Sequence, residues 1–376
     1  MTNKKILLLA HCGEDFYKAR IPFAKFLTEN GYKVYVVVPE DNYTQIIRNE
    51  GLEVLTSRLE RDNVNPVDLL KAIWNVRKFI QHNGIALTHS FKFVPNLINV
   101  FSNLFSGKKV VLHIAGLGIA FANNSLKYTI IRNIFRLLFF LQFIRADLVI
   151  IQNPDDYDDF LFKRKFRNKI KVVKGSGVNT TKFSPTEMPQ RESKTRKLTF
   201  LCTTRLIWEK GIREMVEAFE SLPASLTHNI QLNIIGEPDN KNPRTVSREY
   251  IDRYHSSNLI HFLGRQDNIQ EFLQKSDIFI LPSYYREGIP RSILEALSCG
   301  LPVITTNVPG CNLTVISGKN GLIIEPRSAT EIASAIRNML SRQNDWPEMG
   351  EFSRKLAIRE FSENKIFSEI VKLYDL

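Results

Sequence analysis

Short runs of apolar and β-branched residues recur along the chain and alternate with stretches of helical period. Runs that are apolar throughout predict strands covered on both faces, as in parallel sheets flanked by helices. Six runs lie in each half, and two such series predict an α/β fold with two doubly wound domains. The runs are ILLLA, YKVYVVV, ALTHS, KVVLHI, DLVII and KIKVV in the first half, and LTFLCT, IQLNII, LIHFLG, DIFILP, PVITT and GLIIE in the second.

A polar segment separates the two series. It is SPTEMPQRESKTRK, residues 184–197, which contains proline and shows no hydrophobic period. The length of 376 residues also favours two domains over one. We therefore predict domains at residues 1–187 and 188–376, with a C-terminal helix that is free to cross back to the first domain.

The positive charge is concentrated in the first half. Residues 1–190 contain 27 Lys and Arg against 16 Asp and Glu, whereas residues 191–376 contain 24 against 23. A basic half predicts an anionic partner, and nucleic acid and an anionic membrane surface both qualify. The cysteines form no CxxC pair and predict reduced thiols in a cytoplasmic protein. They are Cys12, Cys202, Cys299 and Cys311.

The stretch LKYTIIRNIFRLLFFLQFIRAD, residues 126–147, is nearly long enough to span a membrane. Its four cations, Lys127, Arg132, Arg136 and Arg145, argue against spanning. Two interpretations remain: a helix packed within the domain, which is the commoner case, or a helix lying partly at a membrane surface. The run KRKFRNKIKVVK, residues 163–174, adds cations nearby.

Two cations follow the first strand of the second half. LTFLCTTRLIWEKGIREMVEAF predicts a strand, a loop and a helix, with Arg205 in the loop and Lys210 at the helix start. Cations beside the free amides of a helix N-terminus form an anion site. Solvated surface charges accompanying Glu209 explain the same residues equally well.

A second strand–loop–helix segment holds two glutamates. In SDIFILPSYYREGIPRSILEALSCGLPVI, a strand ends at Leu281 and Pro290 suits a first helical position. The backbone amides of 288–292 would then point toward a phosphate. Glu295, within an apolar stretch, suits a vicinal diol such as a ribose, and Glu287, in the turn, suits a sugar hydroxyl.

These segments resemble glycosyltransferase family four. The resemblance rests on Glu287-x7-Glu295 within REGIPRSILEA, on RLIWEKG upstream and on VPGCNLTVISGKNGLII downstream. GSGVNTTKFSP at 175–185, HCGEDFYKARIPFAKFL and the GLG at 116–118 extend it into the first half. The resemblance implies the GT-B fold, with two Rossmann-like domains facing a central cleft. It also implies retaining transfer of a hexose or N-acetylhexosamine from a UDP-sugar to a saccharide on undecaprenyl diphosphate, in bacterial glycan assembly.

The resemblance also implies roles for individual residues. Arg205 and Lys210 would bind the donor diphosphate and Glu287 the transferring sugar, as the catalytic groups. The other implied donor contacts are Gly13, Gly236, Arg265, Gly288, Ile289 (where the family often has phenylalanine), Pro290, Arg291 and Glu295. The implied acceptor contacts are Arg20, Arg61, Lys92, His113, Gly116 and Gly118.

A metal site is a competing interpretation of NPDDYDDF, residues 153–160, through Asp156 and Asp158. Asn153 suits an N-cap, Pro154 a first helical position, and acids favour the first turn, so we predict a capped helix and no essential metal or other cofactor. A glycosidase carboxylate pair at Glu287 and Glu295 would leave the phosphate-binding residues without a purpose.

The expected partners are therefore a nucleotide-diphosphate sugar, a lipid-linked saccharide acceptor and an anionic membrane surface, and not nucleic acid. No nucleic-acid motif accompanies the basic bias. The expected location is the inner face of the cytoplasmic membrane. The remaining alternatives are a GT-B sugar-nucleotide epimerase, which needs no acceptor, and a basic nucleic-acid-binding protein.

Overall fold

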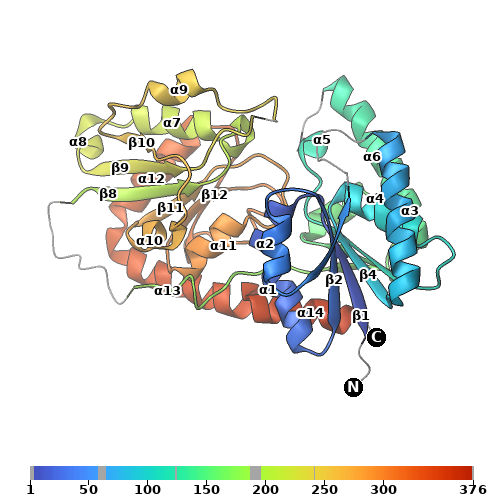
Figure 1. Ribbon diagram of the computed structural model, residues 1–376. Coiled ribbons are helices and arrows are strands. Elements are labelled where there is room, and N and C mark those ends of the chain that lie inside the picture. Colours follow the sequence, from blue (N-terminus) through green and yellow to red (C-terminus); the bar gives the residue numbers. More distant parts are fainter. Residues whose placement is uncertain (1–3, 58–64, 123–124, 187–195, 241, 375–376) are drawn as a thin grey trace. The chain divides into compact units, whose positions relative to one another are not determined.

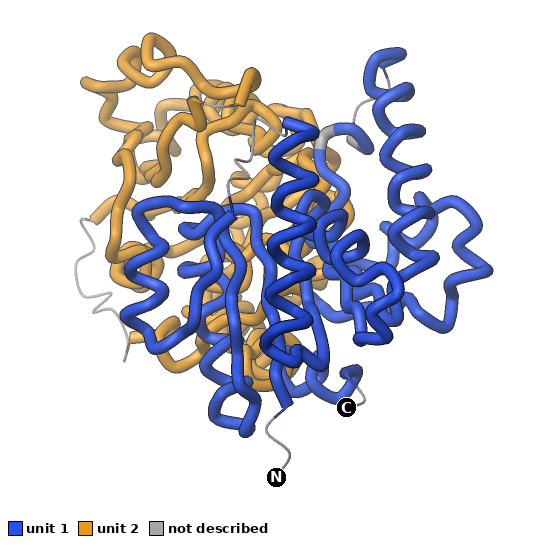
Figure 2. Tube along the Cα trace, turned by 45° about the vertical axis from the view of Figure 1, so that its right-hand side comes forward, with its two compact units in different colours: residues 1–174, 366–376 blue, residues 175–365 orange. Residues whose placement is uncertain are grey.

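The computed structural model describes residues 4–57, 65–122, 125–186, 196–240 and 242–374 (Figure 1). The chain forms two compact units, residues 1–174 with 366–376 and residues 175–365 (Figure 2). The first boundary falls thirteen residues before the expected one at 187/188, and two residues after the last strand of the first sheet. Residues 366–376, from the C-terminal helix, belong to the first unit.

The first unit is built on a seven-stranded parallel sheet. All six predicted strands are present, and a seventh, β3, was not predicted because its residues EVLTS are only half-buried at the sheet edge. The strands are β1 (Lys5–Leu9), β2 (Lys33–Pro39), β3 (Glu53–Ser57), β4 (Leu87–Phe91), β5 (Lys109–Ile114), β6 (Leu148–Ile151) and β7 (Ile170–Val172).

Helices cover both faces of this sheet. Ile6 and Leu8 of β1 pack in one cluster with the helices α1 and α14, whereas Leu7 and Leu9 pack in another with α3 and α4. This alternation is the two-residue period of a strand buried on both sides. The helices of this part are α1 (Gly13–Glu29), α2 (Thr44–Asn49), α3 (Pro66–Asn83), α4 (Phe93–Ser102), α5 (Ile119–Ala122), α6 (Leu126–Arg145), η1 (Pro154–Asp159) and η2 (Lys163–Phe166).

The second unit contains a six-stranded parallel sheet, and its six strands are those predicted. They are β8 (Leu198–Thr203), β9 (Ile230–Ile235), β10 (Ile260–Phe262), β11 (Ile278–Leu281), β12 (Val303–Thr306) and β13 (Gly321–Ile324). Its helices are η3 (Trp208–Lys210), α7 (Ile212–Glu220), α8 (Ala224–Thr227), α9 (Arg248–Asp252), α10 (Ile269–Gln274), α11 (Arg291–Ser298), α12 (Ala329–Ser341), η4 (Gln343–Asp345), α13 (Trp346–Leu356) and η5 (Ala357–Phe361); α14 (Glu363–Tyr374) begins here and ends in the first unit.

The two sheets have the same topology. The strand orders are β3-β2-β1-β4-β5-β6-β7 and β10-β9-β8-β11-β12-β13. In each sheet the order reverses next to the first strand, between β1 and β4 and between β8 and β11. At such a switch point the loops after the two strands diverge to opposite faces, and ligands bind outside the carboxyl ends of these strands.

Neutral histidines lie within the first unit. The imidazoles of His89 and His113 are fully buried and stack 5.5 Å apart. Nδ1 of His89 lies 2.6 Å from the hydroxyl of Tyr374, which attaches the C-terminal helix to the centre of this unit. Burial, together with the charge of Arg20, lowers the pKa of both histidines well below the usual range.

We therefore expect the first unit to lose stability between pH 7 and pH 5. Both histidines stay neutral in the folded chain, whereas the unfolded chain protonates them near the usual pKa of about 6.5. Below that pH each histidine lowers the free energy of unfolding by about 1.4 kcal/mol per pH unit. His113→Gln should remove one such contribution in urea titrations at each pH. Parallel pH profiles for the variant and the wild type would show that His113 is not held neutral.

Candidate active site

The switch point of the second unit brings two of the predicted catalytic residues together. Lys210 ends η3, which follows β8, and Glu287 lies in the loop after β11. The ammonium of Lys210 forms an ion pair with Oε1 of Glu287, which also accepts a hydrogen bond of 3.2 Å from Ser283 Oγ. Their side chains are 7% and 21% exposed, so the pair is shielded from water at the carboxyl edge of the sheet.

Two glycines allow the loops around this pair to approach closely. A Cβ at Gly211 (φ 75°) would lie 2.2 Å from the carbonyl oxygen of Pro282, so the loops after β8 and β11 touch through their backbones. A Cβ at Gly310 (φ 89°) would lie 1.7 Å from the carbonyl oxygen of Gly288, directly after Glu287. Only glycine fits at either position, because both the backbone angle and the space exclude a side chain.

The remaining predicted cation, Arg205, lies in the loop after β8 and is 44% exposed. Its Nη1 donates a hydrogen bond of 2.7 Å to Asp239, in the loop after β9. The same two loops share a second ion pair, in which Nε of Arg244 donates to Oε1 of the buried Glu209 at 2.8 Å. Sequence reasoning missed Asp239 and Arg244, because neither loop reveals its partner without the sheet order.

Glu295 lies in α11 with a 16% exposed side chain, 3.7 Å from Arg291. Burial raises the pKa of Glu295, and Arg291 and Lys182 oppose that rise. Burial also raises the pKa of Glu363, and the same two cations oppose that rise. Lys182 and Glu363 were not predicted, since they come from segments about a hundred residues before and seventy residues after Glu295.

The other residues assigned to the donor fall into two groups. Gly288, Ile289 and Pro290 are buried in the turn before α11, with Pro290 as the N-cap, one position earlier than expected. Gly236 and Arg265 follow β9 and β10. A Cβ at Gly236 would lie 1.8 Å from the carbonyl oxygen of Thr204, so this glycine sets the spacing beside Arg205. The exposed Arg265 lies 3.9 Å from Asp267.

The surroundings of Gly13, in the first unit, differ from the expectation that the donor contacts this residue. It begins α1, and its amide donates a hydrogen bond of 2.8 Å to Asp41. A Cβ at Gly13 would meet this carboxylate at 2.2 Å. The space above this glycine is therefore filled by a side chain that caps the helix.

Two of the residues assigned to the acceptor are internal. Arg20 is 6% exposed, with its Cζ 4.2 Å above the ring of Phe91. His113 is fully buried, with Nε2 3.1 Å from Nε2 of Gln152. His113 has no exposed surface and Arg20 very little, and their roles toward the acceptor stay predictions.

The remaining acceptor assignments lie in loops. Lys92 follows β4 and is 37% exposed. Gly116 (φ 92°) and Gly118 (φ 74°) follow β5 and both adopt left-handed backbone angles. Arg61 lies outside the described residues.

The capped helix predicted at Asn153 is confirmed. The side chain of Asn153 accepts a hydrogen bond of 2.9 Å from the amide of Asp156, and Pro154 begins a 3₁₀ helix. Asp156 is buried, whereas Asp158 is 76% exposed and pairs with Lys163. Among the described residues, no three histidine, cysteine, aspartate or glutamate side chains come together as metal ligands would.

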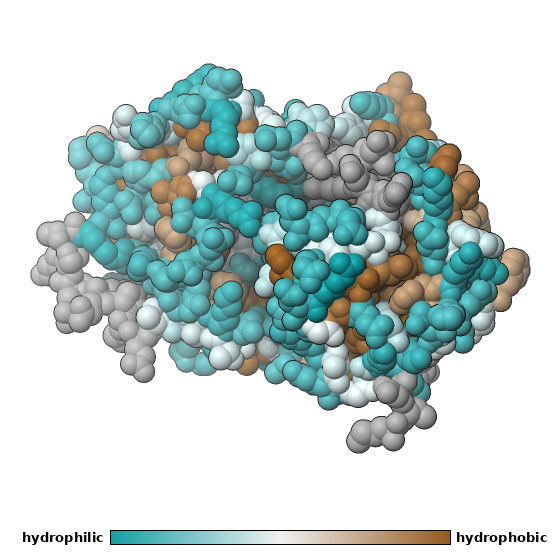
Figure 3. Space-filling view, in the orientation of Figure 1, coloured by the Kyte–Doolittle hydropathy of each residue, from teal (hydrophilic) through white to brown (hydrophobic). Residues whose placement is uncertain are grey.

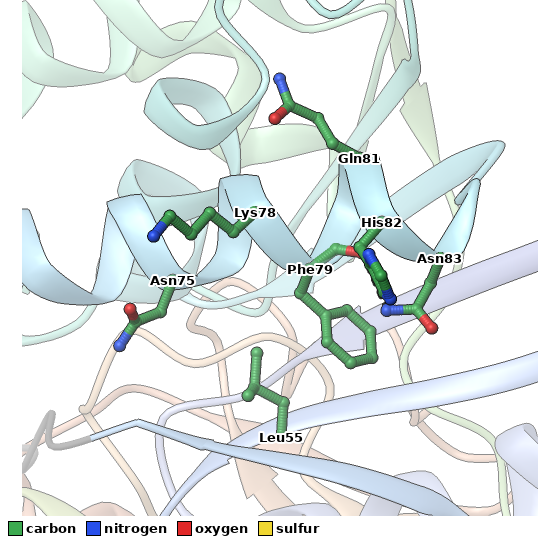
Figure 4. A pocket seen from close by; sticks show the side chains of 7 residues that line it. All are labelled: Leu55, Asn75, Lys78, Phe79, Gln81, His82 and Asn83. Atoms are coloured by element: carbon green, nitrogen blue, oxygen red, sulfur yellow. Dashed lines mark hydrogen bonds between the residues drawn. The ribbon is translucent and has the colours of Figure 1, made fainter.

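A shallow depression of about 720 Å³ lies between α3 and β3, far along the chain from these residues. Figure 4 shows Phe79 directed toward Leu55, while Gln81 points away from the hollow. The depression is wide open, and the amides and the imidazole at its rim do not converge on one point. The depression therefore does not show convergent charged groups like those of the Lys210–Glu287 pair. The other lining residues are Asn75, Lys78, His82 and Asn83.

Two family models match the chain. Residues 5–153 match "Glycosyl transferase 4-like" and residues 183–356 match "Glycosyl transferases group 1". The second match contains Arg205, Lys210, Glu287 and Glu295, but not Lys182 or Glu363.

Several curated proteins are similar over most of their length. An N,N'-diacetylbacillosaminyl-diphospho-undecaprenol alpha-1,3-N-acetylgalactosaminyltransferase from Campylobacter jejuni is 28% identical over 382 residues, covering 99% of this chain and 98% of that protein. A UDP-Gal:alpha-D-GlcNAc-diphosphoundecaprenol alpha-1,3-galactosyltransferase from Escherichia coli is 24% identical, covering 84% and 80%.

Solved structures share the fold. The Anabaena protein HepE in complex with UDP superposes with a TM-score of 0.80 at 18% identity, covering 99% of this chain and all of that one. A glycosyltransferase from Rickettsia africae superposes with a TM-score of 0.80 at 19% identity, covering 100% of this chain and 98% of that one. These likenesses confirm the GT-B class of fold.

Gly310→Ala should destabilise the second unit by more than its backbone angle alone explains. Gly318 has a similar φ of 83°, but no atom lies within 4 Å of a Cβ there, so Gly318→Ala isolates the cost of the angle. We expect Gly318→Ala to lower the free energy of unfolding by about 1–2 kcal/mol. Gly310→Ala should lower it clearly more, as measured by urea denaturation. Equal losses would mean that the close approach to Gly288 is absent in solution.

Proposed function

The chain belongs to the group 1 glycosyltransferases, with a glycosyltransferase 4-like first half, and we propose that it is a retaining enzyme acting on a lipid-linked saccharide. The donor is a UDP-linked hexose or N-acetylhexosamine, and the acceptor a saccharide on undecaprenyl diphosphate. The names of the Campylobacter and Escherichia relatives support this acceptor class. The observation that carries the proposal is the shielded Lys210–Glu287 pair at the switch point of the second unit.

The charges of this site suit departure of a diphosphate. As the bond between the sugar and the diphosphate lengthens, negative charge grows on the leaving group. Lys210 and Arg205, held beforehand by Glu287 and Asp239, stabilise that charge without rearranging water. Glu287 contacts a hydroxyl of the transferring sugar, and Glu295 holds the ribose diol. Gly236, Arg265 and the turn formed by 288–291 complete the donor contacts that we propose in the second unit.

Retention follows if the acceptor attacks from the face that the diphosphate leaves. The acceptor oxygen forms the new bond to the anomeric carbon, the carbon–diphosphate bond breaks, and a diphosphate oxygen takes the acceptor proton. This route uses no separate base and no metal, so EDTA is expected to leave transfer intact. The acceptor is bound by Lys92, by the glycines 116 and 118, and by Arg61.

The two glutamates should separate in their kinetics. Glu287→Gln weakens the hold on Lys210 and the contact to the reacting sugar, so we expect kcat to fall by at least about 100-fold, the scale of losing one transition-state contact. Glu295→Gln removes a ribose contact made equally in ground and transition states, so mainly the donor KM should rise.

The assay follows a radiolabelled sugar from the nucleotide to an undecaprenyl-diphosphate saccharide, with and without EDTA. Glu363→Gln, which alters a neighbouring carboxylate with no assigned donor contact, is the matched control. Equal loss of kcat in both glutamate variants would refute the division of roles. If the protein converts the nucleotide sugar into a different nucleotide sugar without any acceptor, its activity is epimerisation and not transfer.

We also propose that α6 rests on an anionic membrane surface. Six apolar side chains, spaced by three or four residues, lie along one side of this helix and are 45–78% exposed. Figure 3 shows apolar atoms gathered over α6. No described helix is long and apolar enough to cross a bilayer. The six are Leu126, Ile130, Ile134, Leu137, Leu141 and Ile144.

A basic turn lies beside this stripe. Phe162, before η2, packs on Phe140 of α6 at 5.2 Å between ring centroids. It brings Lys163, Arg164 and Lys165 next to the helix. Cations beside an apolar helix face favour anionic headgroups, each by about 1 kcal/mol near the surface.

Ile134→Asn combined with Leu137→Asn should abolish flotation with phosphatidylglycerol vesicles. The wild type should float, and raising the salt should weaken its binding, because the cations are screened. Ile358→Asn, which changes an exposed apolar residue of the second unit, is the control and should float normally. Flotation that is indifferent to lipid charge, or to the α6 substitutions, would contradict this surface.

A further inference from the structure

A lysine–carboxylate pair also lies at the switch point of the first unit. Lys92 follows β4, and Asp15 lies in the first turn of α1, after β1. Nζ of Lys92 is 3.1 Å from Asp15 Oδ1 and 3.4 Å from Nε2 of His11. An ammonium only donates, so Nε2 accepts, which leaves the imidazole proton on Nδ1. The arrangement repeats that of Lys210 and Glu287, with the lysine and the carboxylate exchanged between the two loops.

The backbone of Lys92 is strained. Its φ of 71° and ψ of 175° fall in a region that essentially only glycine occupies. The turn from β4 into α4 fixes this conformation: the amide of Lys92 donates to the carbonyl of His113 at 2.9 Å, and its carbonyl accepts from the amide of Asn96 at 3.1 Å. A glycine would occupy this position without strain, so the presence of lysine indicates that its side chain is needed.

The fold does not explain that need. The side chains of Lys92 and Asp15 are 37% and 30% exposed, and exposed ion pairs add little stability. Burial alone would raise the pKa of Asp15, but the charges of Lys92 and Arg20 are the main causes that lower it to about 2, so the carboxylate is ionised. Asp15 is thus one carboxylate beside two cations, Lys92 and Arg20.

We propose that Lys92 binds a phosphate oxygen of the acceptor's diphosphate, with Asp15 as the positioning residue that orients the ammonium. This inference rests on the proposed function, which supplies the diphosphate. The second source of the same chemistry is the diphosphate of the donor, and the experiment distinguishes the two.

The first test separates strain from function by comparing Lys92→Gly with Lys92→Ala. Both remove the ammonium, but only glycine relaxes the backbone, so Lys92→Gly should unfold about 2–4 °C above Lys92→Ala. At Lys71, within the helix α3, the same two substitutions should give the opposite order. A less stable Lys92→Gly would show that the backbone is not strained in solution.

The second test is kinetic. Both Lys92 variants should lose at least about tenfold in kcat/KM for the lipid-diphosphate acceptor, while donor KM and UDP binding stay unchanged. On the same saccharide carried by an uncharged alkyl group, variants and wild type should transfer equally. As a single substitution, Asp15→Asn should raise the acceptor KM. Combined with Lys92→Gly, it should lower kcat/KM for the acceptor no further than Lys92→Gly alone.

Three results would overturn the proposal: wild-type acceptor kinetics in a folded Lys92→Gly, a loss confined to donor KM, or an equal loss on the uncharged acceptor. The second would assign Lys92 to the donor diphosphate, and the third to a hydroxyl of the saccharide. A wild-type chain that transfers no sugar to any acceptor would refute the proposed function instead, and the unfolding comparison would still report the strain.

Discussion

The reversal of strand order in each parallel sheet is the constraint on which the proposed chemistry depends. Only at this point do the loops after two adjacent strands diverge, leaving room outside the strand ends. In the second unit, Lys210 and Glu287 are 77 residues apart and meet because β8 and β11 are neighbours. In the first unit the same adjacency of β1 and β4 brings Asp15 to Lys92. A different strand order would disperse both pairs.

Placing a lysine and a glutamate out of water is costly unless each neutralises the other. The pair in the second unit is kept together by backbone, not only by charge. Gly211 lets the loop after β8 rest on Pro282, and Gly310 lets a third loop rest on Gly288. These contacts reduce the freedom of the loops before any substrate binds. Cations fixed in this way can stabilise a developing charge without first paying for their own ordering.

The sequence predicted the strands well because buried parallel strands carry continuous apolar runs. The edge strand β3 was not predicted, because a half-buried strand such as Glu53–Ser57 mixes polar and apolar residues. Lys210 and Glu287 were found through their motifs, whereas Asp239 and Arg244 required the spatial order of β8 and β9. The sequence also could not distinguish internal from surface cations. Arg20 was assigned to the acceptor, yet it lies over Phe91 within the first unit.

The uneven charge of the two halves acquires a physical meaning from these contacts. In the second unit the cations of the proposed donor site come with carboxylates: Arg205 with Asp239, Lys210 with Glu287, Arg291 with Glu295. A site built in this way is almost neutral when empty, so like-charge repulsion does not destabilise it. The excess of the first half, in contrast, includes the basic turn beside α6. Under the proposed function, charge gathered on a surface suits an extended anionic partner, whereas the neutral pairs suit one small anion at a time.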